Sequence, residues 1–177
     1  KSLTFTDCDF DSDAEEIFFV NAATNTHLTD LSFTDCTFTS SGKSLFKIED
    51  IGDLTITDCT ISALPDSMRL FWFDSPGAAP VVDYITITNF SSTANLLGEF
   101  LLIDPDVFTM GKIDIDNMDI ICQDVGKGGL NVLNAVSVES VRVVNCDMTA
   151  DTSGFYLPRG ATNGVYLRNN NFVVAYD

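Results

Sequence analysis

The sequence predicts an all-β fold of stacked parallel strands, a parallel β-helix or β-solenoid. Three observations support this prediction. One short pattern recurs along the whole chain, its apolar residues alternate with polar ones, and an Asp or Asn holds the same place in every copy. A repeat of about 20 to 50 residues indicates a solenoid or array, because each unit buries its apolar side only against its neighbours.

The pattern occurs in seven copies, and six steps from residue 3 to residue 165 give a mean repeat of 27 residues. The first three copies are nearly identical, LTFTDCDF, LSFTDCTF and LTITDCTI. We therefore expect a single domain over residues 1–177 with about six to seven coils. The expected coils start near residues 3, 31, 54, 85, 113, 141 and 165.

Each copy begins with a strand whose first and third residues are apolar, with polar residues between them. This alternation is typical of a strand with one buried face. The Asp or Asn follows, and because Asx residues tolerate left-handed backbone, its column predicts a bend between two strands. The bend residues are Asp7, Asp35, Asp58, Asn89, Asn117, Asn145 and Asn169.

A second strand is expected in each coil, over residues 17–20, 45–48, 70–73, 100–103, 130–133 and 155–157. It is apolar on both sides, which is typical of a strand covered on both faces. An outer apolar stripe several coils tall exceeds what soluble monomers normally expose, so we expect an assembly face. Its residues are Phe19, Leu45, Leu70, Trp72, Phe100, Leu102 and Tyr156. The alternative is that one of these columns turns inward at a bend.

Charge excludes several partners. Nine Lys and Arg against 26 Asp and Glu give a net charge of −17, so nucleic acid phosphates would meet a field of their own sign. No apolar run approaches the roughly 18 residues of a membrane helix, and membrane insertion is not expected. The acidity favours an extracellular or cell-surface location. The chain begins at Lys1 and has no hydrophobic leader, so we expect that any targeting segment has been removed.

The five cysteines are Cys8, Cys36, Cys59, Cys122 and Cys146, an odd number without a CxxC pair. Zinc ligands are closely spaced and usually include histidine, so a zinc site is not expected in a chain with one histidine. All five cysteines are candidates for disulfide bonds, and Cys8, Cys36 and Cys59 are expected in one inward column where neighbours come within disulfide range. Cys122 is the candidate for a bond between molecules. The alternative is a stack of free thiols that pack as small apolar groups.

Through the copies of Φ-x-Φ-x-(Asn/Asp)-Φ-x-Φ, where Φ is apolar, the chain resembles the right-handed parallel β-helix superfamily. That superfamily includes pectate lyases, polygalacturonases, phage tailspikes and surface adhesins. The resemblance covers nearly the whole chain, and it implies the fold rather than an activity. The Asn-Thr-Asp, Asp-Asp, Gly-His-Gly and Arg-Ile-Lys motifs of polygalacturonase-like members do not occur here. The arginine and calcium site of pectate-lyase-like members is not recognisable either.

Three outward groups are candidates for chemistry or binding. Asp114 and Asp116 lie about 7 Å apart on one strand, which suits a glycosidase pair, unless Arg142 on the next coil simply neutralises Asp114. The stacked bend residues of the first three copies place carboxylates about 5 Å apart, where calcium or solvent could relieve their repulsion. No other cofactor is expected. Outward Thr-x-Thr pairs in the first copies resemble the ice-binding face of insect antifreeze proteins.

These observations favour a non-enzymatic, extracellular structural protein whose subunits assemble with their own copies into a sheath, fibre or cell-surface layer. Neither end shows a polar cap, so we expect either a segment of a longer β-helix or ends that stack on neighbouring copies. Three alternatives stay open. They are an adhesin or phage-tailspike-type segment that binds cell-surface carbohydrate, a polysaccharide-active enzyme, and an ice-binding protein.

Overall fold

The computed structural model describes residues 1–13, 18–20, 28–41, 44–48, 51–65, 69–73, 81–94, 96–97, 99–103, 109–122, 130–132, 137–150, 155–156 and 163–174. Over these ranges the regular elements are β-strands, and all of their pairings are parallel. The strands stack into a β-solenoid, which confirms the predicted fold class. Within the same ranges, no helix has the length and apolar character needed to span a membrane.

The chain runs around three faces in turn. The first face consists, in stacking order, of β1 (Ser2–Thr6), β4 (Leu28–Thr34), β7 (Ile51–Thr57), β10 (Val81–Ser92), β12 (Thr109–Cys122), β14 (Ser137–Val144) and β17 (Val165–Arg168). The second face contains β2 (Asp9–Ser12), β5 (Thr37–Ser40), β8 (Thr60–Ala63), the ends of β10 and β12, β15 (Asp147–Ala150) and β18 (Asn171–Val174). The third face consists of β3 (Phe18–Val20), β6 (Phe46–Ile48), β9 (Arg69–Phe73), β11 (Glu99–Ile103), β13 (Leu130–Val132) and β16 (Phe155–Tyr156).

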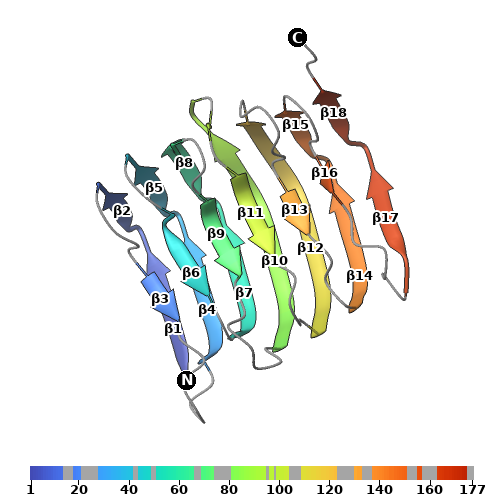
Figure 1. The fold of residues 1–177 in the computed structure, drawn as a ribbon, viewed down its shortest axis with the longest axis horizontal. Coiled ribbons are helices and arrows are strands. Elements are labelled where there is room, and N and C mark those ends of the chain that lie inside the picture. Colours follow the sequence, from blue (N-terminus) through green and yellow to red (C-terminus); the bar gives the residue numbers. More distant parts are fainter. Residues whose placement is uncertain are drawn as a thin grey trace.

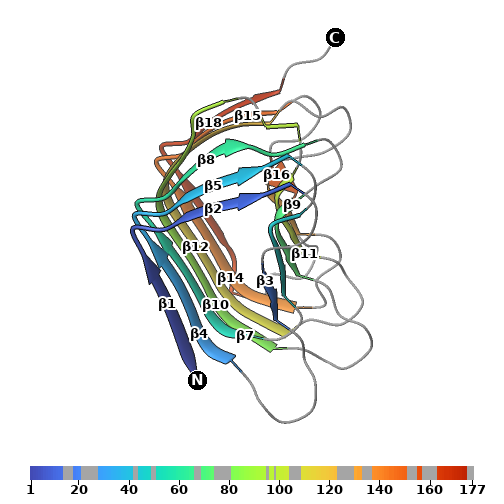
Figure 2. The same cartoon turned by 90° about the vertical axis from the view of Figure 1, so that its left-hand side faces the viewer.

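Successive coils lie side by side in chain order along the long axis of the molecule (Figure 1). Figure 2 looks along the stack and shows the first and second faces meeting at an angle, with the third face across the interior. The strands of the third face agree with the six predicted second strands to within about one residue at each end. Parallel stacking in register places equivalent residues of each coil directly above one another.

The corner between the first and second faces is an Asx residue in left-handed backbone. Its seven members have φ between 53° and 57° and are the non-glycine residues with positive φ in the described ranges: Asp7, Asp35, Asp58, Asn89, Asn117, Asn145 and Asn169. The predicted bend column is therefore confirmed. Asn and Asp adopt this backbone at lower cost than other residues with a β-carbon. Their amides also link coils, since Nδ2 of Asn89 donates to Asp58 (2.7 Å) and Nδ2 of Asn117 donates to Asn89 (2.8 Å).

Aromatic rings fill the interior of the N-terminal coils. Phe33 stacks on Phe5 with ring centroids 5.3 Å apart, and Phe46 stacks on Phe71 at 5.0 Å. Across the interior, Phe33 of the first face meets Phe46 of the third face edge-on at 5.0 Å. Stacked and edge-on pairs are the favourable arrangements of aromatic rings, so the repeat builds its core from like residues in columns.

The cysteines after the bend are free thiols, so the structure does not show the predicted disulfide bonds. This holds for Cys8, Cys36, Cys59 and Cys146, whereas the side chain of Cys122 lies outside the described set. The thiols point back toward their own strands, and Sγ of Cys59 donates to the carbonyl oxygen of Thr57 (3.1 Å). Burial raises the pKa of the Cys59 thiol to about 11, so the thiolate that disulfide exchange requires is scarce. The free-thiol alternative therefore fits these four residues.

Two members of the predicted assembly face were placed wrongly. Leu45 and Leu70 are fully buried, because each lies where the chain enters the third face and turns inward beside the following Phe. The amide of Leu45 donates to the carbonyl oxygen of Arg69 (3.0 Å), which fixes this corner. Trp72 does face outward and is partly exposed. Phe19, Phe100, Leu102 and Tyr156 lie outside the residues whose side chains are described.

Cations cover the ring of Trp72. Nζ of Lys47 lies 4.6 Å and Cζ of Arg69 5.0 Å from the ring centroid. The indole N–H is buried and has no hydrogen-bond partner within the described residues. The described part of the third face therefore shows one aromatic ring shielded by charged side chains and not an open apolar stripe.

Two glycines permit close approach of neighbouring coils on the first face. A β-carbon on Gly52 would lie 2.4 Å from the carbonyl oxygen of Thr29, and one on Gly111 would lie 2.0 Å from that of Asp83. Both neighbours are backbone atoms held by parallel pairing, so neither can move aside cheaply. The start of these strands therefore requires glycine.

Replacing Asn89 by Ala is expected to lower the free energy of unfolding by about 1–3 kcal/mol. The change leaves a β-carbon in left-handed backbone and removes two side-chain hydrogen bonds. Asn89→Gly removes the same bonds without the backbone strain, so its loss should be clearly smaller. Urea unfolding of both variants measures the difference, and equal losses would contradict a role for the backbone conformation.

Replacing Gly111 by Ala should lower the free energy of unfolding by more than about 2 kcal/mol, because its β-carbon would overlap the Asp83 carbonyl. The neighbouring, exposed Lys112 provides the control. Lys112→Ala is expected to stay within about 0.5 kcal/mol of the original protein. Thermal and urea unfolding test both variants, and a Gly111→Ala protein as stable as the control would refute the close approach.

Candidate functional site

The outer surface of the first face carries three columns of side chains in register. The first column is Ser2, Asp30, Asp53, Tyr84, Lys112 and Ser140, and the second is Thr4, Ser32, Thr55, Thr86, Asp114, Arg142 and Tyr166. The third is Thr6, Thr34, Thr57, Thr88, Asp116, Val144 and Arg168. Because side chains alternate between the two sides of a strand, these columns point outward while the residues between them fill the core.

The four N-terminal coils present hydroxyl groups in the second and third columns. The predicted Thr-x-Thr pairs do lie above one another, and the hydroxyls of Thr4 and Ser32 are within hydrogen-bond distance (3.1 Å). This regular array matches the geometry expected from the sequence. Ice binding itself is a function, and it stays a prediction.

The character of the surface changes at β12. Here Asp114 and Asp116 replace the hydroxyl residues, and Arg142 on β14 bridges them. Nη1 of Arg142 lies 2.5 Å from Oδ1 of Asp114, and Nη2 lies 2.8 Å from Oδ2 of Asp116. Asn145 adds a fourth member, since its Nδ2 donates to Oδ1 of Asp116 (2.9 Å). The expected pairing of Arg142 with Asp114 is confirmed, and the same guanidinium also binds Asp116.

These contacts set the charge states of the cluster. The hydrogen bond from Arg142, assisted by that from Asn145, holds the pKa of Asp116 below its ordinary value. The hydrogen bonds to Asp116 and Asp114 hold the pKa of Arg142 above its ordinary value. A glycosidase needs one carboxyl group with a raised pKa to serve as general acid. The environment of Asp116 shifts its pKa in the opposite direction.

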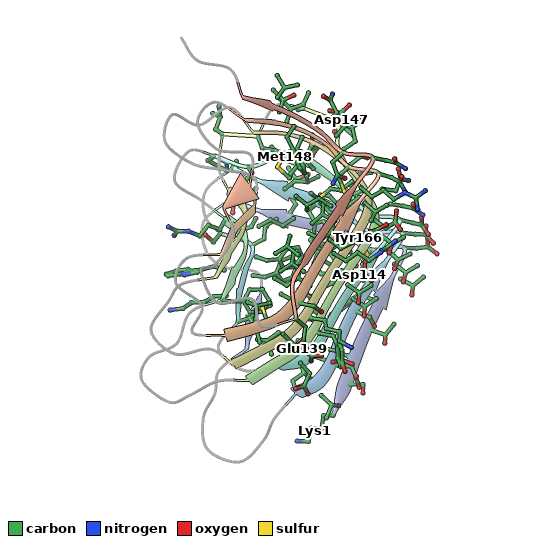
Figure 3. The ribbon with its side chains drawn as sticks, turned by 90° about the vertical axis from the view of Figure 1, so that its right-hand side faces the viewer. Lys1, Asp114, Glu139, Asp147, Met148 and Tyr166 are labelled. Atoms are coloured by element: carbon green, nitrogen blue, oxygen red, sulfur yellow. The ribbon has the colours of Figure 1, made fainter. Side chains whose placement is uncertain are left out.

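Two adjoining surface depressions lie beside this cluster. One, of about 320 Å³, lies among residues that include Tyr84, Lys112, Asp114, Ser140 and Arg142. The other, of about 360 Å³, is bounded by Arg142, Asn163 and Tyr166, with Ser140 and Gly164 also lining it. Ser140 and Arg142 line both, so the two depressions share a border, and together they are called the trough. Figure 3 shows Asp114, Glu139 and Tyr166 on the same outer side of the solenoid.

The depressions exist because small residues follow large ones in the columns. Ser140 succeeds Tyr84 and Lys112 in the first column, and Gly164 lies directly beyond it. Gly164 has φ of +101°, and a β-carbon there would have no atom within 4 Å. Tyr84 (45% exposed) and Tyr166 (51% exposed) rise at the two ends. The result is an elongated trough with an aromatic side chain at each end.

Lys112 is held on one wall of the trough. Its Nζ lies 3.9 Å from Oε1 of Glu139 and 5.7 Å from the centroid of the Tyr84 ring. The Glu139 carboxylate and the Tyr84 ring both attract the ammonium group of Lys112. Exposed pairs of this kind nevertheless contribute little to the stability of the fold. The charge of Lys112 is therefore balanced within the wall, as the charge of Arg142 is balanced by two aspartates.

The bend column offers no metal centre in the described part of the chain. No group of three or more His, Cys, Asp or Glu side chains there is close enough to hold a metal ion. Asp7, Asp35 and Asp58 are exposed, and the first amide in the column, that of Asn89, donates to Asp58. Calcium at this column therefore has no supporting ligand set among the described residues.

Sequence reasoning found Asp114, Asp116 and Arg142 but missed Tyr84, Lys112, Ser140 and Tyr166. The available signal was the column position, because all of these residues occupy outward places in the repeat where earlier coils carry Ser, Thr or Asp. Tyr84 and Tyr166 are exposed and lie three coils apart. Only the register of the stacked strands shows that both line the same trough.

Comparisons of the chain with protein-family models, with curated proteins and with solved structures find no significant match.

Replacing Arg142 by Ala should lower the free energy of unfolding at pH 7 by up to about 1 kcal/mol, since the cluster is partly exposed. The pKa of Asp116 is lowered in the folded protein, so its stabilising contribution is present above its ordinary pKa of 3.8. That contribution is lost as the pH falls through the lowered value. The difference between variant and original protein should therefore shrink below pH 3.8.

Urea unfolding at several pH values measures this difference, and an NMR titration of the Asp116 carboxyl should show its pKa rising in Arg142→Ala. Arg142→Lys provides a control that keeps the positive charge but cannot bridge two carboxylates in the same way. An Asp116 pKa that does not change when Arg142 is removed would contradict the assigned cause.

Proposed function

We propose that this protein is a non-enzymatic, extracellular recognition module of the adhesin kind, which binds polysaccharide on the outer surface of its first face. The observation that carries the proposal is the pair of adjoining depressions around Ser140, with Tyr84 at one end and Tyr166 at the other. An open, elongated site suits a polymer that lies along a surface, whereas small ligands are usually enclosed in concave pockets. The net charge of −17 supports an extracellular setting.

The state of the acidic residues supports binding without hydrolysis. Both carboxylates of the predicted glycosidase pair accept hydrogen bonds from the Arg142 guanidinium. A carboxylate in such a pair is a poor proton donor, because the neighbouring positive charge favours its ionised form. The trough therefore provides groups that can stack on a ligand and form hydrogen bonds with it, but its carboxylates are poorly suited to act as a general acid.

The predicted self-assembly into a sheath or fibre relied on an exposed apolar face, and three members of that face do not fit it. Leu45 and Leu70 are buried, and Trp72 is covered by Lys47 and Arg69. The other members of that face are outside the described side chains. Assembly with copies of itself accordingly stays a prediction, and the binding module becomes the first proposal.

Blocking the trough should abolish binding. Ser140 lines both depressions, so Ser140→Trp places a large side chain where the polymer would lie. Ser62→Trp on β8 is the matched control, because Ser62 is a strand serine with an exposed side chain on the second face, outside both depressions. Retention of each purified variant on surfaces coated with neutral or anionic polysaccharides provides the measurement. The chain length of each polysaccharide is measured before and after incubation with the protein, which detects cleavage.

We expect the original protein and Ser62→Trp to be retained on at least one polysaccharide, with no shortening of the polymer, and Ser140→Trp to be washed off. Circular dichroism confirms that both variants are folded. Equal retention of the two variants would overturn the proposal. So would polymer cleavage that disappears in Asp114→Asn.

A further inference from the structure

We propose that the polymer bound in this trough is an uncharged oligosaccharide chain that lies along the solenoid axis, with Tyr84 and Tyr166 as stacking platforms at its two ends. This inference rests on the proposed function and adds the charge, direction and contact points of the ligand. Four features of the trough support it: the separation of the tyrosines, the open floor, the donors of Arg142 that form no hydrogen bond within the described residues, and the balance of charge.

The separation of the tyrosines sets the length of the ligand. β10 and β17 are three steps apart in the first face, which corresponds to about 14 Å at about 4.8 Å per step. Tyr84 stands in the first column and Tyr166 in the second, which adds about 7 Å across the strands. A single sugar ring can therefore contact only one platform. A chain of several linked rings can contact both, and its direction must follow the stack of coils.

The floor between the platforms lets a ring approach the backbone. Ser140 contributes one short hydroxyl side chain, and Gly164 contributes none, with open space where its β-carbon would be. Asn163 lies at the edge, where its Nδ2 donates to Glu139 (3.3 Å). The short polar side chains here, the hydroxyl of Ser140 and the amide of Asn163, can exchange hydrogen bonds with the hydroxyl groups of a sugar.

Arg142 lies at the centre of the trough and retains donors for a ligand. A guanidinium has five N–H donors, and within the described residues the hydrogen bonds to Asp114 and Asp116 use one each of Nη1 and Nη2. The two aspartates fix the plane of the group. A fixed planar donor beside two aromatic platforms favours a ligand with many neutral acceptors, such as a sugar chain.

The charge balance excludes an anionic chain. Both cations that line the trough already face carboxylates, Lys112 facing Glu139 and Arg142 facing Asp114 and Asp116. Arg168 belongs to a separate hollow with Asn169 and Asn170. An acidic sugar would thus find no uncompensated cation among the residues lining the trough and would meet the field of a chain with net charge −17. An uncharged sugar pays no such penalty.

Isothermal titration calorimetry on the whole chain tests the inference. The probes are cello-, manno- and laminari-oligosaccharides of two and six rings, with a hexamer of galacturonate as the anionic probe and a chitosan hexamer as the cationic one. We expect at least one uncharged hexamer to bind and the matching dimer to bind at least tenfold more weakly. The galacturonate hexamer should show no binding, even at low salt.

Variants then test the platforms. Tyr84→Ala and Tyr166→Ala should each weaken binding of the uncharged hexamer by about three- to tenfold, since each removes one stacking surface. Tyr84→Phe and Tyr166→Phe keep the ring and should stay within about twofold. Leu97→Ala, at an exposed apolar residue outside both depressions, should have no effect. Unfolding midpoints of all variants confirm that the fold is retained.

The outcomes separate the two proposals. Preferred binding of the galacturonate or chitosan hexamer, equal affinity for dimer and hexamer, or unchanged affinity in both Ala variants would overturn this inference. In each of those cases, loss of retention in Ser140→Trp would still support the proposed function. If no polysaccharide of any charge is retained by the original protein, both proposals fall.

Discussion

Every coil of this solenoid turns at one Asp or Asn held in left-handed backbone, and the rest of the structure depends on that bend. Because the bend lies at the same place in each repeat, the strands before and after it stack in register. Stacking in register turns each position of the repeat into a column. The column then decides whether a residue contributes to the core, to a corner or to the outer surface.

This arrangement separates the core from the surface. Inward columns need only apolar residues of suitable volume, and one of them changes from Phe33 through Ile56 to Val143 along the stack. Outward columns carry little packing constraint, so they can change from Thr to Asp, Arg or Tyr within one coil while the fold continues. The trough on the first face arises from such a change, because small outward residues follow large ones in the first column.

The two halves of the first face differ in electrostatics. Toward the N-terminus, Asp30 and Asp53 stack in the first column, and burial together with the charges of Asp30 and Asp83 raises the pKa of Asp53. Toward the C-terminus, Lys112 and Arg142 compensate their acidic neighbours. The bend column follows the same division. The stacked carboxylates of the first three coils cannot donate to one another, whereas the asparagines form amide links such as those between Asn117, Asn89 and Asp58.

The repeat alone determined the parallel stack, the bend column and the inward positions, because these follow from local alternation and from the backbone preference of Asx. It also located Asp114, Asp116 and Arg142 on adjacent strands. Only the tertiary structure decided that Leu45 and Leu70 turn inward, since corner geometry depends on how one face leads into the next. The same is true of the trough. Tyr84, Ser140 and Tyr166 are far apart in sequence, and only the register of the stacked coils brings them to one site.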